Sequence, residues 1–347
     1  MKEIKELTGL RWIAALWVFL FHLQLKGVVP EWDWRINNVI GQGAMGVVVF
    51  FILSGVVLLY SHSRRQKIPF VPFMQKRVFR IAPVYLAGLL ASLVAVLVLH
   101  VVPQQLGVLF LLNLTFLNAW IPSLAMEWYG SGGWSLGCEM LFYSCTPPLI
   151  LLFARWSQRT LIVLLLSMFI VGALPGLFSA IHPELHLFNW VYSFPPARLP
   201  EYIAGMLLAV LVFRFGWQVP AWLGAAALVM LLGYLAYRGP LLGGWVCHNW
   251  LVLPALVLFI GSLLNEKKSI LFSWLGSGLF TYLGKLSYGF YIWQIVLMIV
   301  LDALKGRGQL PQGSVSAMAA LFVINLAVSA LSYHLLENPA HKWLSKR

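Results

Sequence analysis

The twenty residues from Ser61 to Arg80, SHSRRQKIPFVPFMQKRVFR, decide how this chain folds. They contain six Lys and Arg side chains and lie between two long apolar runs. The chain has no acidic residue between Asp33 and Glu127. Short loops rich in Lys and Arg stay on the cytoplasmic side of a membrane. The segment therefore predicts a cytoplasmic loop between two membrane-spanning helices.

The composition of the whole chain agrees with a membrane protein. Of its 347 residues, 61% are apolar and only 10% are charged, whereas roughly a quarter of the residues in soluble globular domains are charged. This excludes a soluble enzyme. Spans of about 20 residues each would occupy most of the chain. We therefore expect one transmembrane domain over residues 1–347, with no appended soluble domain.

The net charge is strongly positive. Lys and Arg number 24 against 11 Asp and Glu, which gives a formal charge of +13. In a soluble protein this excess would suggest nucleic acid as a partner. In a membrane protein, an excess of Lys and Arg first of all marks the loops on the cytoplasmic side. We therefore expect membrane lipids around the chain and no nucleic-acid partner.

Eleven apolar runs are candidate spans. If all eleven crossed the membrane, the cations Arg155, Arg159, Lys267 and Lys268 would lie outside. They return to the inside if residues 105–121 do not cross. The candidate runs are residues 10–29, 43–61, 81–102, 105–121, 134–153, 160–180, 199–215, 220–237, 249–264, 280–302 and 314–336.

The run 105–121 is also the weakest of these candidates. It is short, and it carries the polar residues Asn113, Thr115 and Asn118 before a segment broken by Pro and Gly. Irregular backbone at membrane depth occurs only where it packs on protein or lines a cavity. We therefore predict an all-α bundle of about ten transmembrane helices with both termini in the cytoplasm. Residues 105–121 would form a re-entrant or surface-lying element on the outer side, near the functional site.

Two ionisable residues fall within the first span. Such residues are costly inside a membrane and indicate functional sites. Arg11 and His22 are eleven positions apart, which places them on one face of a helix about 16 Å apart. A snorkelling arginine and a hydrogen-bonded core histidine would explain each residue singly, but their shared face favours a functional pair.

A carboxylate is expected near His22. In the span predicted to enter at Trp134, the residues Ser135, Glu139 and Tyr143 follow one polar face. Counted by helical rise, Glu139 would lie roughly 8 Å and His22 about 12 Å below the outer surface. We therefore expect Glu139 to contact His22, where a carboxylate would fix the tautomer that a general base needs. A structural pairing of Glu139 with another donor is the alternative.

A basic cluster is expected at the inner face. Arg77 and Arg80 precede the third span at an i, i+3 spacing, and Arg11, Lys285 and Glu337 reach the same level from three other spans. Four cations against one carboxylate exceed what structural pairing requires, and Arg is well suited to phosphate. Ordinary positive charge flanking the spans is the alternative.

Two further groups of polar residues have simpler interpretations. Arg198 and Glu201 have the spacing of a structural salt bridge within one helix. His182, Glu184 and His186 lie in a predicted outer loop, but their spacing fits no zinc site well. We therefore expect no metal.

Six segments, in order along nearly the whole chain, resemble the acyltransferase family 3 membrane proteins. The first segment holds Arg11 and His22 with ten residues between them, and the third carries the Arg-x-x-Arg pair Arg77 and Arg80. Each pattern alone is weak, but six in order are specific. The segments are LTGLRWIAALWVFLFH, GAMGVVVFFILSG, FMQKRVFRIAPVY, WSLGCEMLFY, LGKLSYGFYIW and SYHLLENP.

The resemblance implies a multi-pass O-acyltransferase of the bacterial inner (plasma) membrane. It would move an acyl group, foremost acetyl, from cytoplasmic acyl-CoA to a hydroxyl of a cell-surface or lipid-linked carbohydrate. Acyl-CoA would be a co-substrate, with no tightly bound cofactor.

The resemblance also implies roles for individual residues. His22 would act as a general base or carry the acyl group, oriented by Glu139. The CoA phosphates would bind a group of cations, and neighbouring side chains would support the site. The cations are Arg11, Arg77, Arg80 and Lys285, and the supporting residues are Trp134, Ser135, Tyr143, Ser287, Tyr288 and Glu337.

Two departures and two alternatives accompany the resemblance. The family often has an acidic residue where this chain has Val48 and a His where it has Gln294, so roles at those positions are not carried over. A proton-coupled transporter of a sugar or acyl donor, using His22 and Glu139, is one alternative, although no internal repeat is visible. An acyltransferase acting on a cytoplasmic small molecule is the other.

Overall fold

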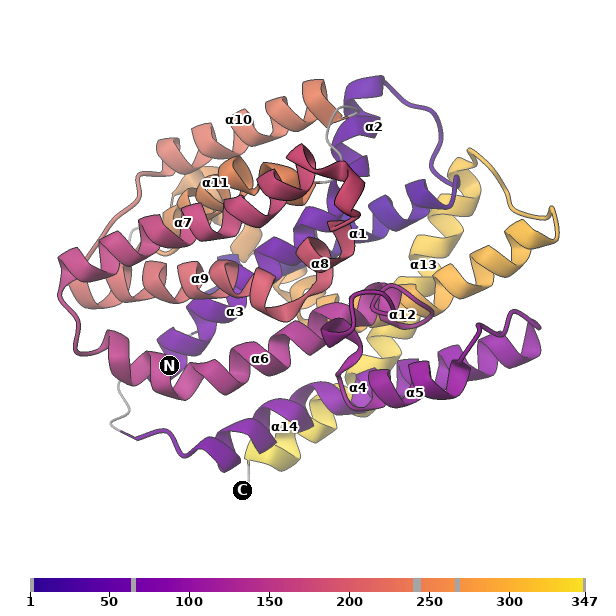
Figure 1. The fold of residues 1–347 in the computed structure, drawn as a ribbon, viewed down its shortest axis with the longest axis horizontal. Helices are drawn as coiled ribbons and strands as arrows, with labels where there is room; N and C mark the ends of the chain where they lie inside the picture. The colour runs from indigo at the N-terminus through magenta and orange to yellow at the C-terminus, as the bar shows by residue number, and fades with distance from the viewer. Residues whose placement is uncertain (1–2, 64–66, 240–244, 266–268, 346–347) are drawn as a thin grey trace.

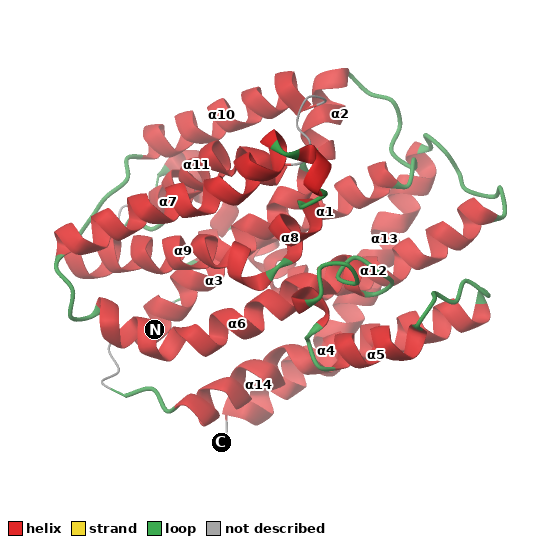
Figure 2. Cartoon of the chain, viewed as in Figure 1, coloured by secondary structure: helices red, strands yellow, loops and turns green. Residues whose placement is uncertain are grey.

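The computed structural model describes residues 3–63, 67–239, 245–265 and 269–345 (Figure 1). Every regular element in these ranges is helical (Figure 2), so the all-α prediction is confirmed. Several cations used in the topology argument lie outside the described residues. They are Lys2, Arg64, Arg65, Lys267, Lys268, Lys346 and Arg347.

Ten helical segments of the described chain are long and apolar enough to cross a membrane, as expected. Shorter helices connect or extend them. The long helices are α1 (Lys5–Leu25), α3 (Gly46–His62), α4 (Phe70–Val98), α6 (Gly130–Phe153), α7 (Gln158–Ile181), α9 (Pro195–Phe215), α10 (Ala221–Arg238), α11 (Asn249–Leu263), α12 (Gly278–Gly306) and α13 (Val315–Ser332). The shorter elements are α2 (Trp34–Gly41), α5 (Leu106–Leu114), α8 (Phe188–Ser193), α14 (Asn338–Ser345), the 3₁₀ turns η1 (Gly43–Met45), η2 (Asn118–Trp120), η3 (Pro183–Leu185), η5 (Trp245–His248) and η6 (Ile270–Gly276), and the π-helical turn η7 (Tyr333–Glu337).

Helix α5 is the element predicted not to cross. It has 9 residues, about 14 Å of helix, against a hydrocarbon core of about 30 Å. Turns and irregular backbone follow it up to α6. Its last turn is held by Tyr85 of α4, whose hydroxyl donates to the carbonyl of Asn113 at 2.9 Å. Helix α5 is therefore too short to cross as a helix, in agreement with the expectation, and the side of the membrane on which it lies stays a prediction.

The connections between the long helices gather at two ends of the bundle. At one end, Arg214 donates to the carbonyls of Phe153 and Trp156, which joins the end of α9 to the α6–α7 connection. At the other, Arg307 donates to the carbonyl of Leu99, which joins the α12–α13 and α4–α5 connections. Figure 1 shows both termini at the first of these ends. We call it the N/C end and the other the opposite end.

The central helices α3 and α9 touch through their backbones. A Cβ on Gly55 would lie 2.2 Å from the carbonyl oxygen of Tyr202, and one on Gly205 would lie 2.1 Å from that of Ile52. Helix association within a membrane depends on such close packing, because lipid is as apolar as the side chains. The two helices therefore pack closely at the centre of the bundle.

Three helices begin earlier than their apolar runs. Helix α1 begins at Lys5, α4 at Phe70 and α6 at Gly130, whereas the predicted spans begin at residues 10, 81 and 134. A helix needs backbone hydrogen bonds and not apolar side chains, so it continues past the point where hydrophobicity ends. As a result, Arg77 and Arg80 lie inside α4 and not at its start.

Candidate active site

Four cavities follow one another through the bundle, and the first two contain the basic cluster. The entrance cavity, of about 500 Å³, lies at the N/C end, where Arg11, Arg80, Lys285 and Glu337 are among its lining residues. The arginine cavity, of about 100 Å³, lies deeper and is lined by Arg11 and Arg80 together with Arg77. Four helical elements, α1, α4, α12 and η7, thus bring the predicted cluster together, with the exposed Lys285 at the entrance only.

The three arginines keep their hydrogen-bond donors free. Within the described part of the chain, Arg11, Arg77 and Arg80 make no hydrogen bond or direct ion pair with the protein. Arg77 packs over the ring of Phe73, 5.4 Å from its centroid. One carboxylate oxygen of Glu337 also has no hydrogen-bond partner there. Arginines that share a cavity and retain their donors form a site suited to an anionic group.

Glu139 balances this positive charge from α6. Its carboxylate lines the arginine cavity, accepts a hydrogen bond from the hydroxyl of Tyr143 one turn along the helix, and interacts electrostatically with Arg11, Arg77 and Arg80. The polar face predicted for this helix therefore points into the basic cluster.

The middle cavity, of about 50 Å³, continues from the arginine cavity into an apolar region. Its walls combine four apolar side chains with hydroxyl groups from α6 and α12. Trp134 lies behind one wall, edge-on to Phe51 with ring centroids 6.0 Å apart. The apolar residues are Val47, Phe50, Phe51 and Leu136, and the hydroxyls belong to Ser135, Ser287, Tyr288 and Tyr291.

Ser287 and Tyr288 are fixed by backbone carbonyls. The hydroxyl of Ser287 donates to Gly284 in its own helix at 2.8 Å. The hydroxyl of Tyr288 donates to Ile81 of α4 at 2.7 Å. Tyr288 therefore ties α12 to the helix that carries Arg77 and Arg80.

A partition of hydroxyl groups closes the far side of the middle cavity. The hydroxyl of Tyr291 donates to the carbonyl of Gly132 at 2.7 Å and lies 3.0 Å from the Ser135 hydroxyl. Gly132 also lines the next cavity. One layer of protein therefore separates the middle cavity from that next cavity.

The histidine cavity, of about 410 Å³, lies at the opposite end and contains His22. Nδ1 of His22 lies 3.1 Å from Oε1 of Gln294, which is fully buried. An amide oxygen can only accept a hydrogen bond, so Nδ1 carries the proton and Nε2 keeps its lone pair. Lys26 lines the same cavity and is paired with Asp302 at 2.6 Å.

The expected contact between His22 and Glu139 is wrong. His22 bonds to Gln294, and Glu139 bonds to Tyr143. Glu139 lies nine positions into α6, about 14 Å from its first residue, whereas His22 lies three positions before the end of α1, about 5 Å from it. The expectation assumed later helix starts, which placed the two residues at similar depths.

Gln294 and Tyr291 are the site residues that sequence reasoning missed. Gln294 was noted only as a departure from the family pattern. A signal was present, because Tyr288, Tyr291 and Gln294 recur every three residues along the same predicted span. Their side chains contact Ile81, Gly132 and His22, respectively.

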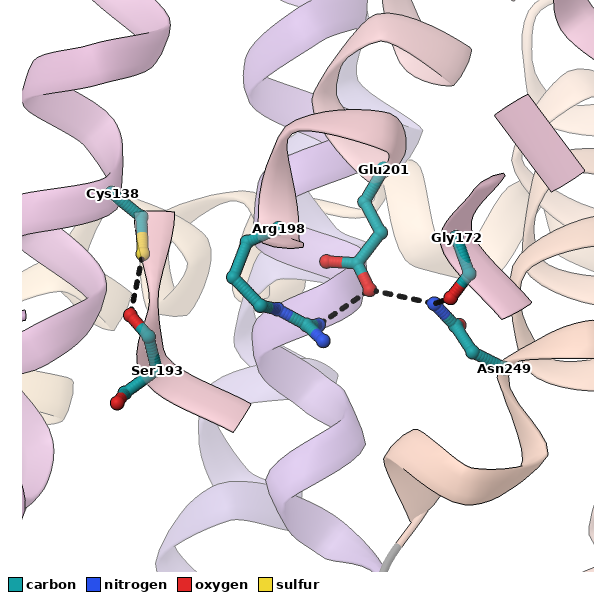
Figure 3. Close-up of polar contacts among 6 residues, drawn as sticks. All are labelled: Cys138, Gly172, Ser193, Arg198, Glu201 and Asn249. Carbon is teal, nitrogen blue, oxygen red and sulfur yellow. Dashed lines mark hydrogen bonds and ion pairs between the residues drawn. The ribbon is translucent and has the colours of Figure 1, made fainter. Parts of the chain in front are cut away.

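A separate buried network lies beside these cavities (Figure 3). Arg198 donates to Oε1 of Glu201, and Asn249 donates to the same oxygen at 3.1 Å and to the carbonyl of Gly172 at 3.0 Å. The predicted salt bridge is confirmed, and it links α7, α9 and α11. The guanidinium of Arg198 also lies 5.9 Å from the ring centroid of Phe51.

The loop considered for a metal holds only a surface pair. Nδ1 of His182 lies 3.0 Å from Glu184, and both side chains are exposed. Among the residues that the structure describes, no three His, Cys, Asp or Glu side chains gather as a metal site.

Comparison with known proteins identifies the family. The model of acyltransferase family 3, described as an acyltransferase domain, matches residues 4–334. Acyltransferase MdmB of Streptomyces mycarofaciens is 26% identical over 99% of this chain and 93% of its own length. Exopolysaccharide production protein ExoZ of Rhizobium meliloti is 29% identical over 86% of this chain and 89% of its own length.

A third relative extends beyond the matched region. O-acetyltransferase OatA of Staphylococcus aureus is 22% identical over 98% of this chain, which covers 58% of that protein. No solved structure matches the chain. The chain therefore belongs to acyltransferase family 3, and it is a multi-span membrane acyltransferase.

Proposed function

We propose that this enzyme transfers a short acyl group, foremost acetyl, from acyl-CoA at the N/C end to a carbohydrate hydroxyl at the opposite end. One observation carries the proposal: a cavity with free arginines and a cavity with a histidine approach each other from the two ends of one bundle. Membership of an acyltransferase family favours this reaction over the transporter alternative.

The donor binds at the N/C end. The diphosphate and phosphate of acyl-CoA contact Arg11, Arg77 and Arg80, and Lys285 attracts them at the entrance. Arg guanidinium groups bind phosphate through paired hydrogen bonds. Described cations such as Arg155 and Arg214 lie at the same end, which by the positive-inside rule makes it cytoplasmic. Acyl-CoA is a cytoplasmic metabolite, so the donor and its binding site face the same compartment.

The acceptor binds in the histidine cavity. Aromatic rings and a few polar groups are typical of small-molecule sites, and here the rings of Phe188 and Tyr192 stack 5.3 Å apart. Gln42 and Lys26 supply polar groups in the same cavity. The names of two relatives refer to exopolysaccharide production and O-acetyl transfer, which supports a carbohydrate acceptor at the bacterial cell surface.

His22 supplies the general base. The partition at Tyr291 opens for the reaction, and Nε2 of His22 then accepts the proton of the acceptor hydroxyl while that oxygen attacks the thioester carbonyl carbon. A carbon–oxygen bond forms, the carbon–sulfur bond breaks, and the departing CoA thiolate takes the proton from the imidazolium. Gln294 holds the imidazole in the required tautomer throughout. Glu139 and Tyr143 offset the charge of the arginines and do not take part in proton transfer.

The test is acyl transfer by the protein reconstituted in lipid vesicles, with labelled acetyl-CoA and the surface polysaccharide of the source strain. His22→Ala should lose about 10²–10⁴-fold in rate, the usual contribution of a general base. Arg77→Ala/Arg80→Ala should raise the KM for acetyl-CoA. Arg159→Ala removes an exposed cation from the same end of the bundle and should change neither value. Full transfer by His22→Ala would refute the proposal. Transfer only to acceptors supplied at the N/C end would refute the proposal that the acceptor binds at the opposite end.

A further inference from the structure

We propose that the middle cavity is the acyl-chain subsite and that Val47 sets the longest acyl group it accepts. The inference rests on the proposed function, because it takes acyl-CoA to enter from the N/C end. It adds a specificity-determining residue from α3, a helix to which the proposed reaction gives no role.

The order of the cavities matches the order of groups in an acyl-CoA. The entrance and arginine cavities share Arg11 and Arg80, and the arginine and middle cavities share Arg11 and Glu139. The path therefore begins among cations and ends in a space lined by apolar side chains and hydroxyl groups, with Arg11 and Glu139 at its mouth. An acyl-CoA has its phosphates at one end and its acyl group at the other, with the long pantetheine arm between them. Phosphates at the entrance therefore place the arm along the arginine cavity and direct the acyl group inwards.

The size of the middle cavity limits the acyl group. Its volume is about 50 Å³, and one water molecule needs about 10–15 Å³ of such space. The cavity therefore has room for only a few atoms, and it is the smallest of the four. An acetyl group has three non-hydrogen atoms, a propionyl group four and a butyryl group five, so each added methylene is harder to accommodate.

Three of the four apolar wall residues are packed closely against the rest of the bundle. Val47, Phe51 and Leu136 are almost fully buried, at 3%, 1% and 3% exposure. Phe51 is held edge-on by Trp134 and Phe142, at centroid distances of 6.0 and 4.9 Å.

The network of Figure 3 supports the same wall. Arg198 lies near the face of Phe51 and is itself fixed by Glu201, which Asn249 holds in turn. Charged groups buried in this way resist displacement, because a shift would leave an unpaired charge in an apolar interior. The buried ion pair therefore keeps Phe51 in place.

The far end of the cavity is closed as well. Tyr291 bonds to Gly132 and contacts Ser135 there, so an acyl chain that enters before the partition opens is limited on the side of His22. Val47 and Leu136 are the aliphatic side chains of the wall, where a small substitution changes the volume without removing a hydrogen bond. Val47 is the smaller of the two and can be replaced by a smaller or a larger aliphatic residue.

The experiment compares acetyl-, propionyl- and butyryl-CoA as donors. One missing or extra methylene in a hydrophobic pocket changes kcat/KM by about 10–200-fold. We therefore expect the wild type to prefer acetyl-CoA over butyryl-CoA by at least about tenfold. Val47→Ala should reduce that preference by about tenfold or more. Val49→Ala is the matched control, because Val49 is buried in the same helix but lines none of the four cavities.

A second substitution acts in the opposite direction. Val47→Ile adds one methyl group and should lower the use of propionyl-CoA relative to acetyl-CoA, and it decides the question alone if Val47→Ala does not fold. The proposal is overturned if active Val47 variants keep the donor preference of Val49→Ala. Failure of the wild type to consume any acyl-CoA would instead refute the proposed function, before any variant is compared.

Discussion

At the scale of single residues, the catalytic histidine of the proposed reaction is oriented by an amide. A carboxylate partner would carry charge into the bundle, whereas Gln294 fixes the Nδ1 proton of His22 without any charge. Because Gln294 is neutral, it orients the imidazole only through the geometry of this hydrogen bond. In the proposed reaction, Gln294 is therefore a positioning residue that acts through His22.

Replacing Gln294 should test that role. Gln294→Leu leaves the buried Nδ1–H of His22 without an acceptor, which costs about 1–3 kcal/mol. We expect kcat for acetyl transfer to fall by about tenfold or more, with KM for acetyl-CoA unchanged. Gln294→His restores a ring nitrogen as acceptor and should recover part of the rate. Equal kcat for Gln294→Leu and wild type, or no rescue by Gln294→His, would argue against positioning.

The sequence predicted correctly which residues share a helix face. It did not predict correctly how deep in the bundle each residue lies. The helical repeat placed Glu139 and Tyr143 on one face, and they are hydrogen-bonded. Depth requires the residue at which a helix begins, and hydrophobicity does not reveal it, because helices continue beyond the apolar core. For this reason Glu139 was assigned to His22 and lies instead among the arginines.

At the scale of elements, the crossing of α3 and α9 holds the wall of the middle cavity. Gly55 and Gly205 bring the two backbones into contact, and Val47 and Phe51 project from the same helix as Gly55. The separation of these two helices therefore fixes the position of the acyl subsite that we propose.

A methyl group at this crossing should destabilise the protein. In Gly205→Ala the new Cβ would meet the carbonyl oxygen of Ile52 at 2.1 Å. Overpacking of this kind costs about 1–3 kcal/mol, so we expect a lower Tm in detergent and reduced transfer activity. Gly233→Ala in α10 is the control, because a Cβ there has nothing within 4 Å and Ala favours a helix by about 0.5–1 kcal/mol. If both variants melt at the wild-type Tm, the contact is not stabilising.

The short helix α5 was the element best anticipated from sequence. Its polar residues and the charge balance of the later loops both argued against a crossing, and the structure ends the helix at Leu114. The helix-to-helix contacts, by contrast, depend on which glycines face each other. That information is distributed over segments far apart in the chain, so α3 and α9 could not be paired in advance.

At the scale of the whole molecule, ten passes place the N-terminus, the C-terminus and the α6–α7 connection at one end. Charge and the short, polar-interrupted run at residues 105–121 together predicted this arrangement, because a grouping of the loops with ten passes collects most of the cations at one end. The composition therefore determined the number of passes, while the cavities between them had to be seen in the structure.

Cysteine labelling in intact cells should establish the orientation. In a background lacking the three native cysteines, Gln104→Cys, Glu127→Cys and Gln312→Cys should react with a membrane-impermeant maleimide. Ala154→Cys should react only after the cells are opened. Protection of Glu127→Cys while Gln104→Cys reacts would mean that α5 crosses, and labelling of Ala154→Cys from outside would invert the bundle.

The partition formed by Tyr291, Ser135 and Gly132 has a consequence for the cell's energy supply. A continuous column of water between the arginine-lined and the histidine-lined spaces would let protons run down their gradient. The hydrogen bond from Tyr291 to Gly132 lies across that route. With the partition closed, a cell could keep many copies of this enzyme in its membrane without losing its proton-motive force.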